Sequence, residues 1–225
     1  MAKAPAKSKS AKMSKRAETS KSAAKPKTAA SSRSTQAAGS ARTTASRTAS
    51  KAKSAARSGK PQKGLADLFE HALKDIYYAE KNIYKALPKM IKAAHDPQLK
   101  TALTQHREDT AGQIGKLEQV FAALDKKPRG AKCDAIDGIL KEGDGLLEDF
   151  GGSPAGDAAI IFSCQAVEHY EITRYGSMAT YAQALGHTTV ADLLYAILEQ
   201  EKAADDNLSV LGENRVNAAA ETGDA

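Results

Sequence analysis

The sequence lacks several features that mark common classes of protein. It has no Trp and only two Cys, Cys133 and Cys164, which give no disulfide framework and suit a reducing compartment. No run of large apolar residues is long enough for a membrane span or a signal peptide. No phosphate-binding loop, dinucleotide fingerprint or nucleophile motif is present, which leaves a hydrolase with little support. We therefore predict a cytoplasmic protein that does not interact with a membrane.

Residues 1–63 have very few large apolar side chains and a single acid. They contain no Leu, Ile, Val, Phe, Tyr or Trp, and 17 Lys and Arg stand against a single acid, Glu18. Such a segment cannot bury enough apolar surface to offset its ordering entropy, so we predict a disordered basic tail. A mitochondrial transit peptide shares this acid-poor composition, but here Lys exceeds Arg and no apolar face exists for an amphipathic helix.

The charge of this tail suggests DNA as a partner. Lys and Arg side chains release counterions from DNA phosphates, and a tail without aromatic residues would bind without sequence preference and with strong salt dependence. The alternative is a solvated tail that only increases solubility. On the first interpretation the protein is associated with the nucleoid. The residues predicted to contact phosphates are Lys7, Lys9, Lys12, Lys15, Arg16, Lys21, Lys25, Lys27, Arg33, Arg42, Arg47, Lys51, Lys53 and Arg57.

The remaining 162 residues are acidic and have a different pattern, with 16 basic and 26 acidic side chains. Apolar residues recur there at three- and four-residue steps, and no segment alternates with period two. Four long helices are expected, at about 65–94, 97–124, 154–185 and 189–211, with one or two short helices within 134–150. This pattern predicts an all-α fold, a four-helix bundle with an additional short helix between helices 2 and 3. We expect the bundle to occupy 64–213 and a flexible C-terminal tail to occupy 214–225.

Three helix starts carry capping residues. Asp96 is expected to cap the second long helix, with Pro97 at its first position, where a missing N–H costs nothing. Ser153 is expected to cap the third long helix. Thr189, with Asp192 three residues later, resembles a capping box at the start of the fourth.

Polar residues interrupt the apolar face of every long helix near its middle. Burying an unpaired carboxylate costs several kcal/mol, so carboxylates gathered in one core need a compensating charge. Hard metal ions provide it, as in the di-iron and di-manganese bundles. We therefore predict a site for two metal ions, iron or manganese. The inward polar residues are Glu80 on the first helix, His106, Asp109 or Thr110, and Gln113 on the second, Glu168 and Glu171 on the third, and Glu201 with Asp205 at its border on the fourth.

Each of these residues also has a simpler interpretation. A single Glu on an apolar face often lies at the margin of the stripe, where its charge reaches water. His169 lies about 100° around the helix from Glu168, so we expect it on the surface or at an interface. Tyr175 lies on the same face as Glu171 and is a candidate partner of the metal ligands.

Four segments carry a resemblance to a known family: "DIYYAEKNIYKALPKM", "LEQVF", "AVEHYEITRYG" and "ADLLYAILEQEKAADDNL". They resemble, in the same order, the YciF-like group of bacterial ferritin-like stress proteins. The resemblance covers about residues 65–213 and none of the basic tail. It implies a ferritin-like four-helix bundle, a homodimer and a dinuclear metal site. The ligand positions that it implies are Glu80, Asp109, Glu168, Glu171 and Glu201, with His106 and Gln113 as further candidates.

The sequence departs from the broader ferritin-like pattern, in which two helices carry a Glu followed three residues later by a His. Here His106 precedes Asp109, and the residue three positions after Glu201 is Ala204. Fewer imidazoles make the site richer in carboxylates.

The sequence leaves two functions open. The first is a stress protein that binds iron or manganese and handles dioxygen or peroxide; if it is an enzyme, it is a metal-dependent oxidoreductase. The second is a non-enzymatic scaffold or nucleoid protein, in which the inward acids pair with Lys or His across a dimer and no catalytic metal is bound.

Overall fold

The structure, a computed structural model, describes residues 62–223, and the predicted DNA-binding Lys and Arg of the basic tail lie outside them. The described part of the chain is helical and contains no strand, which confirms the all-α fold class. Its elements are α1 (Leu65–Ala93), α2 (Pro97–Ala123), α3 (Asp134–Phe150), α4 (Gly156–Ala184), α5 (Thr188–Leu211), the π-helix η1 (Gly212–Val216) and α6 (Asn217–Thr222).

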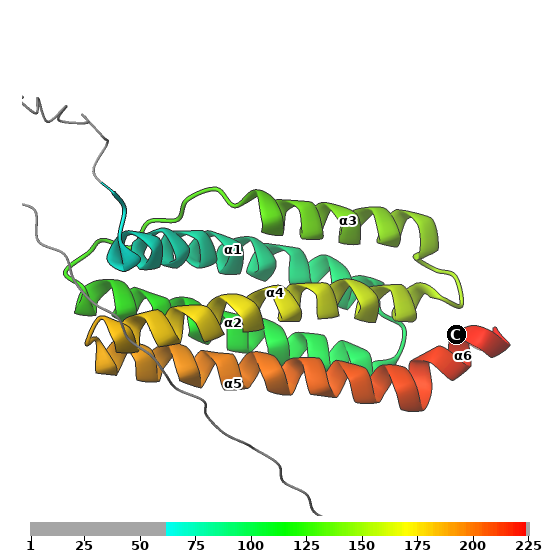
Figure 1. The fold of residues 1–225 in the computed structure, drawn as a ribbon. Helices are drawn as coiled ribbons and strands as arrows, with labels where there is room; N and C mark the ends of the chain where they lie inside the picture. Colours follow the sequence, from blue (N-terminus) through cyan, green and yellow to red (C-terminus); the bar gives the residue numbers. More distant parts are fainter. Residues whose placement is uncertain (1–61, 224–225) are drawn as a thin grey trace, which may run out of the picture. The chain divides into compact units, whose positions relative to one another are not determined.

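The four long helices α1, α2, α4 and α5 form the bundle (Figure 1). Each packs against two others, in the circular order α1, α2, α5, α4. The chain passes from α2 to α4 through α3, which lies outside the bundle against α4 and α1. This long crossover, with a single helix in it, is the ferritin-like connection and confirms the predicted additional helix.

Helix starts agree with the sequence in one case and not in two. The Asp96 carboxylate accepts from the backbone N–H groups of Gln98 and Leu99 at 2.8 and 3.0 Å, and Pro97 opens α2 as predicted. The predicted caps at Ser153 and Thr189 are wrong. Helix α4 begins only at Gly156 without a side-chain cap, because residues around Ser153 form backbone turns. Helix α5 follows His187, again without a side-chain cap.

The C-terminal segment differs from the predicted flexible tail. The chain stays helical beyond residue 213, through η1 and α6, as far as Thr222. Val216 is buried, and Arg215 forms an ion pair with Asp96 at the start of α2. These contacts hold the segment against the end of the bundle, a role that its short, Ala-rich sequence does not reveal.

Apolar layers close the bundle above and below its middle. On α1, Leu73 and Ile76 precede Glu80 and Ile83 and Leu87 follow it on the same face, and all are buried. Layers of apolar side chains at both ends of the bundle therefore separate the polar side chains at its centre from water.

Candidate metal centre

Four glutamates meet in the middle of the bundle. Glu80 comes from α1, Glu168 and Glu171 from α4, and Glu201 from α5, and none exposes more than 1% of its surface. Glu168 and Glu171 are three residues apart, so both point from α4 to the same side. The helical periodicity thus places four carboxylates at one depth of the core, which is unusual for residues that seldom become fully buried.

The ligand atoms fall into two groups. One consists of His106, Glu168 and Glu171, and the other of Glu80, Glu171 and Glu201. In each group one atom per residue lies within 4.8 Å of the others. Glu171 belongs to both, so its carboxylate lies between two neighbouring positions that could each hold an ion.

Burial shapes the protonation of these glutamates. It raises the pKa of Glu80, Glu171 and Glu201 well above the usual value, and repulsion between neighbouring carboxylates raises these pKa values further. The pKa of Glu168 rises to about 8, again mainly through burial. Without an added cation, the cluster must hold protons at neutral pH, because four negative charges in a low-dielectric core repel one another.

Many polar atoms of the cluster have no hydrogen-bond partner, although native proteins satisfy nearly all such atoms. Carboxylate and amide oxygens without a partner are the ligands that hard cations use. The residues present therefore fit a pair of metal ions. The buried atoms without a partner in this region are Glu80 Oε2, Gln113 Oε1 and Nε2, Glu168 Oε2, Glu171 Oε1, and Glu201 Oε1 and Oε2.

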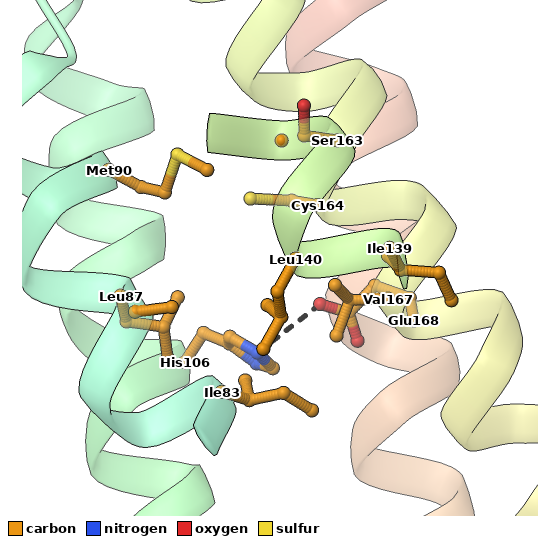
Figure 2. A pocket seen from close by; sticks show the side chains of 12 residues that line it. Ile83, Leu87, Met90, His106, Ile139, Leu140, Ser163, Cys164, Val167 and Glu168 are labelled. Atoms are coloured by element: carbon orange, nitrogen blue, oxygen red, sulfur yellow. Dashed lines mark ion pairs between the residues drawn. The ribbon is translucent and has the colours of Figure 1, made fainter. Parts of the chain in front are cut away.

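His106 and Glu168 face each other at one end of the cluster (Figure 2). His106 Nε2 lies 3.3 Å from Glu168 Oε1, and Thr110 donates to the His106 carbonyl at 2.8 Å. Burial lowers the pKa of His106 to about 4. The imidazole is therefore neutral at physiological pH, which is the form that binds metals.

Tyr175 and Lys116 support the other end. The Tyr175 hydroxyl is fully buried and donates to Glu80 Oε1. Lys116, on α2, is half-buried, and its charge acts on Glu80 and Glu201, opposing the rise of their pKa values. Lys116 escaped the sequence prediction because a Lys at the edge of a helical stripe usually belongs to a solvated face.

Two of the predicted acidic residues, Asp109 and Asp205, do not join either group. Asp109 is half-buried and accepts from Gln105 at 3.2 Å. Thr110, which the sequence left as the alternative, takes the buried position on α2. Asp205 accepts from His169 at 3.1 Å and from Gln165 at 3.3 Å. His169 is exposed, as predicted from its angle to Glu168.

The residues of the two groups determine which ligands a bound ion would have. Glu80, Glu168, Glu171 and Glu201 would neutralise two cations, and His106 would add one nitrogen ligand. Bound ions would supply Lewis acidity and, for iron or manganese, redox chemistry. The protein's own part is to hold the carboxylates apart, to orient Glu80 through Tyr175, and to exclude water with the apolar layers.

Fold and site together define a class, a ferritin-like helical bundle with a buried carboxylate cluster. The chain belongs to the family described as domain of unknown function DUF892, whose profile matches residues 64–221. It is 41% identical over 160 residues to the protein YciF of Escherichia coli strain K12, covering 71% of this chain and 96% of that protein.

Solved structures agree with this membership. The crystal structure of the E. coli stress protein YciF has a TM-score of 0.66 and 40% identity, covering 69% of this chain and 99% of that one. YcfI of Rhodopseudomonas palustris, described as a candidate structural protein, has a TM-score of 0.64 and 47% identity, covering 65% and 94%. A protein from Xanthomonas campestris shares the fold at a TM-score of 0.58 and 24% identity, covering 72% of this chain and 100% of that one.

No helix among residues 62–223 is both long and apolar enough to span a membrane.

Proposed function

We propose that this YciF-like protein binds two hard metal ions, iron or manganese, in the middle of its bundle and acts in stress protection. One observation carries the proposal: four buried glutamates from three helices converge, and most of their oxygens lack hydrogen-bond partners. Two divalent ions supply the four positive charges that this cluster requires. Carboxylate-rich sites favour iron and manganese over softer metals.

The direct test is the metal content of protein purified without chelators. We expect about two ions per chain by elemental analysis, and a fall in thermal stability after chelation, because ions that bind only the folded state stabilise it. Less than one ion per chain, together with full stability after chelation, would overturn the proposal. Glu142→Gln is a matched control, since Glu142 is an exposed carboxylate on α3.

A scaffold function is the second candidate. It is favoured by the description of the relative YcfI as a candidate structural protein and by the 17 positive charges of residues 1–63. Deletion of residues 1–63 separates the possibilities for DNA. Loss of a salt-sensitive DNA affinity would support a DNA-binding tail, whereas retained affinity in the acidic bundle would contradict it.

A homodimer also stays a prediction. Phe162 on α4 and Val210 on α5 are 63% and 55% exposed, and such apolar side chains suit an interface between copies of the chain. Light scattering of the full-length protein measures its mass directly, and a monomer at micromolar concentration would contradict the prediction.

A further inference from the structure

A small cavity lies beside the His106–Glu168 end of the cluster (Figure 2). It lies under α3, between α1 and α4, and has a volume of about 30 Å³. A single water molecule needs roughly 10–15 Å³ in the same measure. The space therefore admits one or two molecules of that size and no organic substrate.

The walls of this cavity are almost entirely apolar. In Figure 2 the side chains of Ile83, Leu87 and Met90 from α1 lie on one side, and those of Cys164 and Val167 from α4 lie on another. Leu140 and Ile139 from α3 cover it.

Few polar groups are available to a molecule inside the cavity. Ser163 also lines it, but its hydroxyl already donates to the Ala159 carbonyl at 2.9 Å. The remaining strong hydrogen-bonding groups are His106 and Glu168, at the end that faces the cluster. A buried water needs two to four polar partners, so the part of the cavity away from His106 and Glu168, where none is available, should stay dry.

We propose that this cavity is a binding site for dioxygen next to the His106–Glu168 end of the cluster. The assignment of dioxygen as the occupant rests on the proposed metal-binding function. Dioxygen is small and apolar, so it loses little hydration on entering such a space. Hydrogen peroxide has two O–H donors, and His106 and Glu168 lie at one end only, so a peroxide in the apolar part would leave at least one donor without a partner, which costs free energy. The cavity thus selects dioxygen as the oxidant that reaches the cluster from the α3 side.

Two small residues keep the cavity open. A Cβ atom at Gly143 of α3 would lie 3.2 Å from the Met90 methyl carbon and 3.4 Å from Ser163 Cβ, so a larger side chain there would compress the lining. Ala86 of α1 also lines the cavity and is half-buried. Substitutions at these positions should fill the cavity without removing a candidate metal ligand.

Xenon tests the cavity without any metal, because it occupies dry apolar cavities in proteins. Crystals of the metal-free wild-type protein under xenon pressure should show an anomalous peak among Ile83, Met90 and Val167. Gly143→Val and Ala86→Leu should each remove the peak, and since they lie on different helices, one remains informative if the other does not fold. Gly138→Val is the matched control, because a Cβ at Gly138 meets nothing within 4 Å. Absence of xenon from the wild-type cavity, or its retention in both filled variants, would overturn the proposal.

The choice of oxidant has its own measurement. In protein loaded with ferrous iron, Ala86→Leu should slow oxidation by dioxygen at least tenfold relative to Gly138→Val, and should leave oxidation by hydrogen peroxide unchanged. Equal slowing with both oxidants would refute the selection of dioxygen. If the wild-type protein binds no iron, the proposed function fails while the xenon result stands, so the two failures are distinguishable.

Discussion

Glu168→Gln should make the metal-free protein more stable. At neutral pH the folded protein keeps Glu168 protonated, since its pKa is about 8 against 4.5 for an exposed Glu. Taking up that proton costs the folded state about 3 kcal/mol near pH 7, by the linkage between pKa shifts and stability. Gln resembles the protonated carboxyl group in shape and has no such cost. The variant should therefore unfold at a temperature roughly 6–12 °C higher than wild type in the presence of a chelator.

The stability advantage of Glu168→Gln should grow as the pH rises. A carboxyl group with a raised pKa in the folded state stabilises fully below its unfolded pKa, and that stability is lost as pH rises through the folded pKa. The advantage of the variant should thus be about 1 kcal/mol at pH 5 and about 4 kcal/mol at pH 8. His106, whose pKa is lowered to about 4, destabilises the fold in the opposite direction, as pH falls below about 6.5. Because wild type and variant both contain His106, its effect on stability largely cancels when their free energies of unfolding are subtracted.

Metal should offset most of the variant's advantage in stability. An ion at 100 times its dissociation constant stabilises the folded state by about 2.7 kcal/mol, and Glu168→Gln removes a ligand from one of the two groups. Wild type should therefore gain more from manganese than the variant does. Urea denaturation with chelator and with manganese, at several pH values, measures both effects, with Glu142→Gln as the control. A metal-free variant no more stable than wild type at pH 8 would refute the reasoning about burial.

Glu171 belongs to both ligand groups, so Glu171→Gln should lose nearly all metal by elemental analysis while Glu168→Gln keeps about half; equal losses would contradict a shared ligand. Tyr175→Phe removes the donor to Glu80 and should lower the free energy of unfolding of the metal-free protein by ~1–3 kcal/mol; an unchanged urea midpoint would contradict this. Asp96→Ala removes the cap of α2 and should lower the free energy of unfolding by ~1 kcal/mol, measured by calorimetry. Because this cap is remote from the cluster, the loss should be the same with and without metal, and a different loss in the two conditions would contradict this.

The sequence was a good guide where a physical cause acts locally. Hydrophobic periodicity located the long helices, and an Asp followed by Pro marked the start of α2 because both residues act within one turn. The predicted cap at Ser153 was wrong because the chain forms backbone turns there before α4 begins. A Ser followed by a Pro occurs both at helix starts and in turns, so the sequence does not distinguish them. The glutamates stood out because Glu80, Glu171 and Glu201 lie between apolar residues on both sides of the same stripe.

The remaining features depend on angles and volumes that no single helix determines. From His106, Asp109 and Thr110 are rotated by about 60° and 40° in opposite directions, and sequence spacing alone cannot choose between them. The packing of α2 buries Thr110 and leaves Asp109 half-buried. The cavity is still less predictable, because its walls come from α1, α2, α3 and α4 and its volume depends on the small size of Gly143 and Ala86.

Helix α2 contributes a histidine, His106, to the cluster where a carboxylate would add another negative charge. Because His106, Thr110 and Gln113 are the buried polar residues of this helix, it adds no carboxylate to the core. With all four glutamates ionised, the cluster would hold four negative charges, which two divalent ions would neutralise. Two trivalent ions would leave an excess positive charge in a medium of low dielectric constant. Further anions would be needed to offset that excess, and Lys116 beside Glu80 and Glu201 makes it larger. In charge, the four carboxylates would therefore match two divalent ions more closely than two trivalent ions.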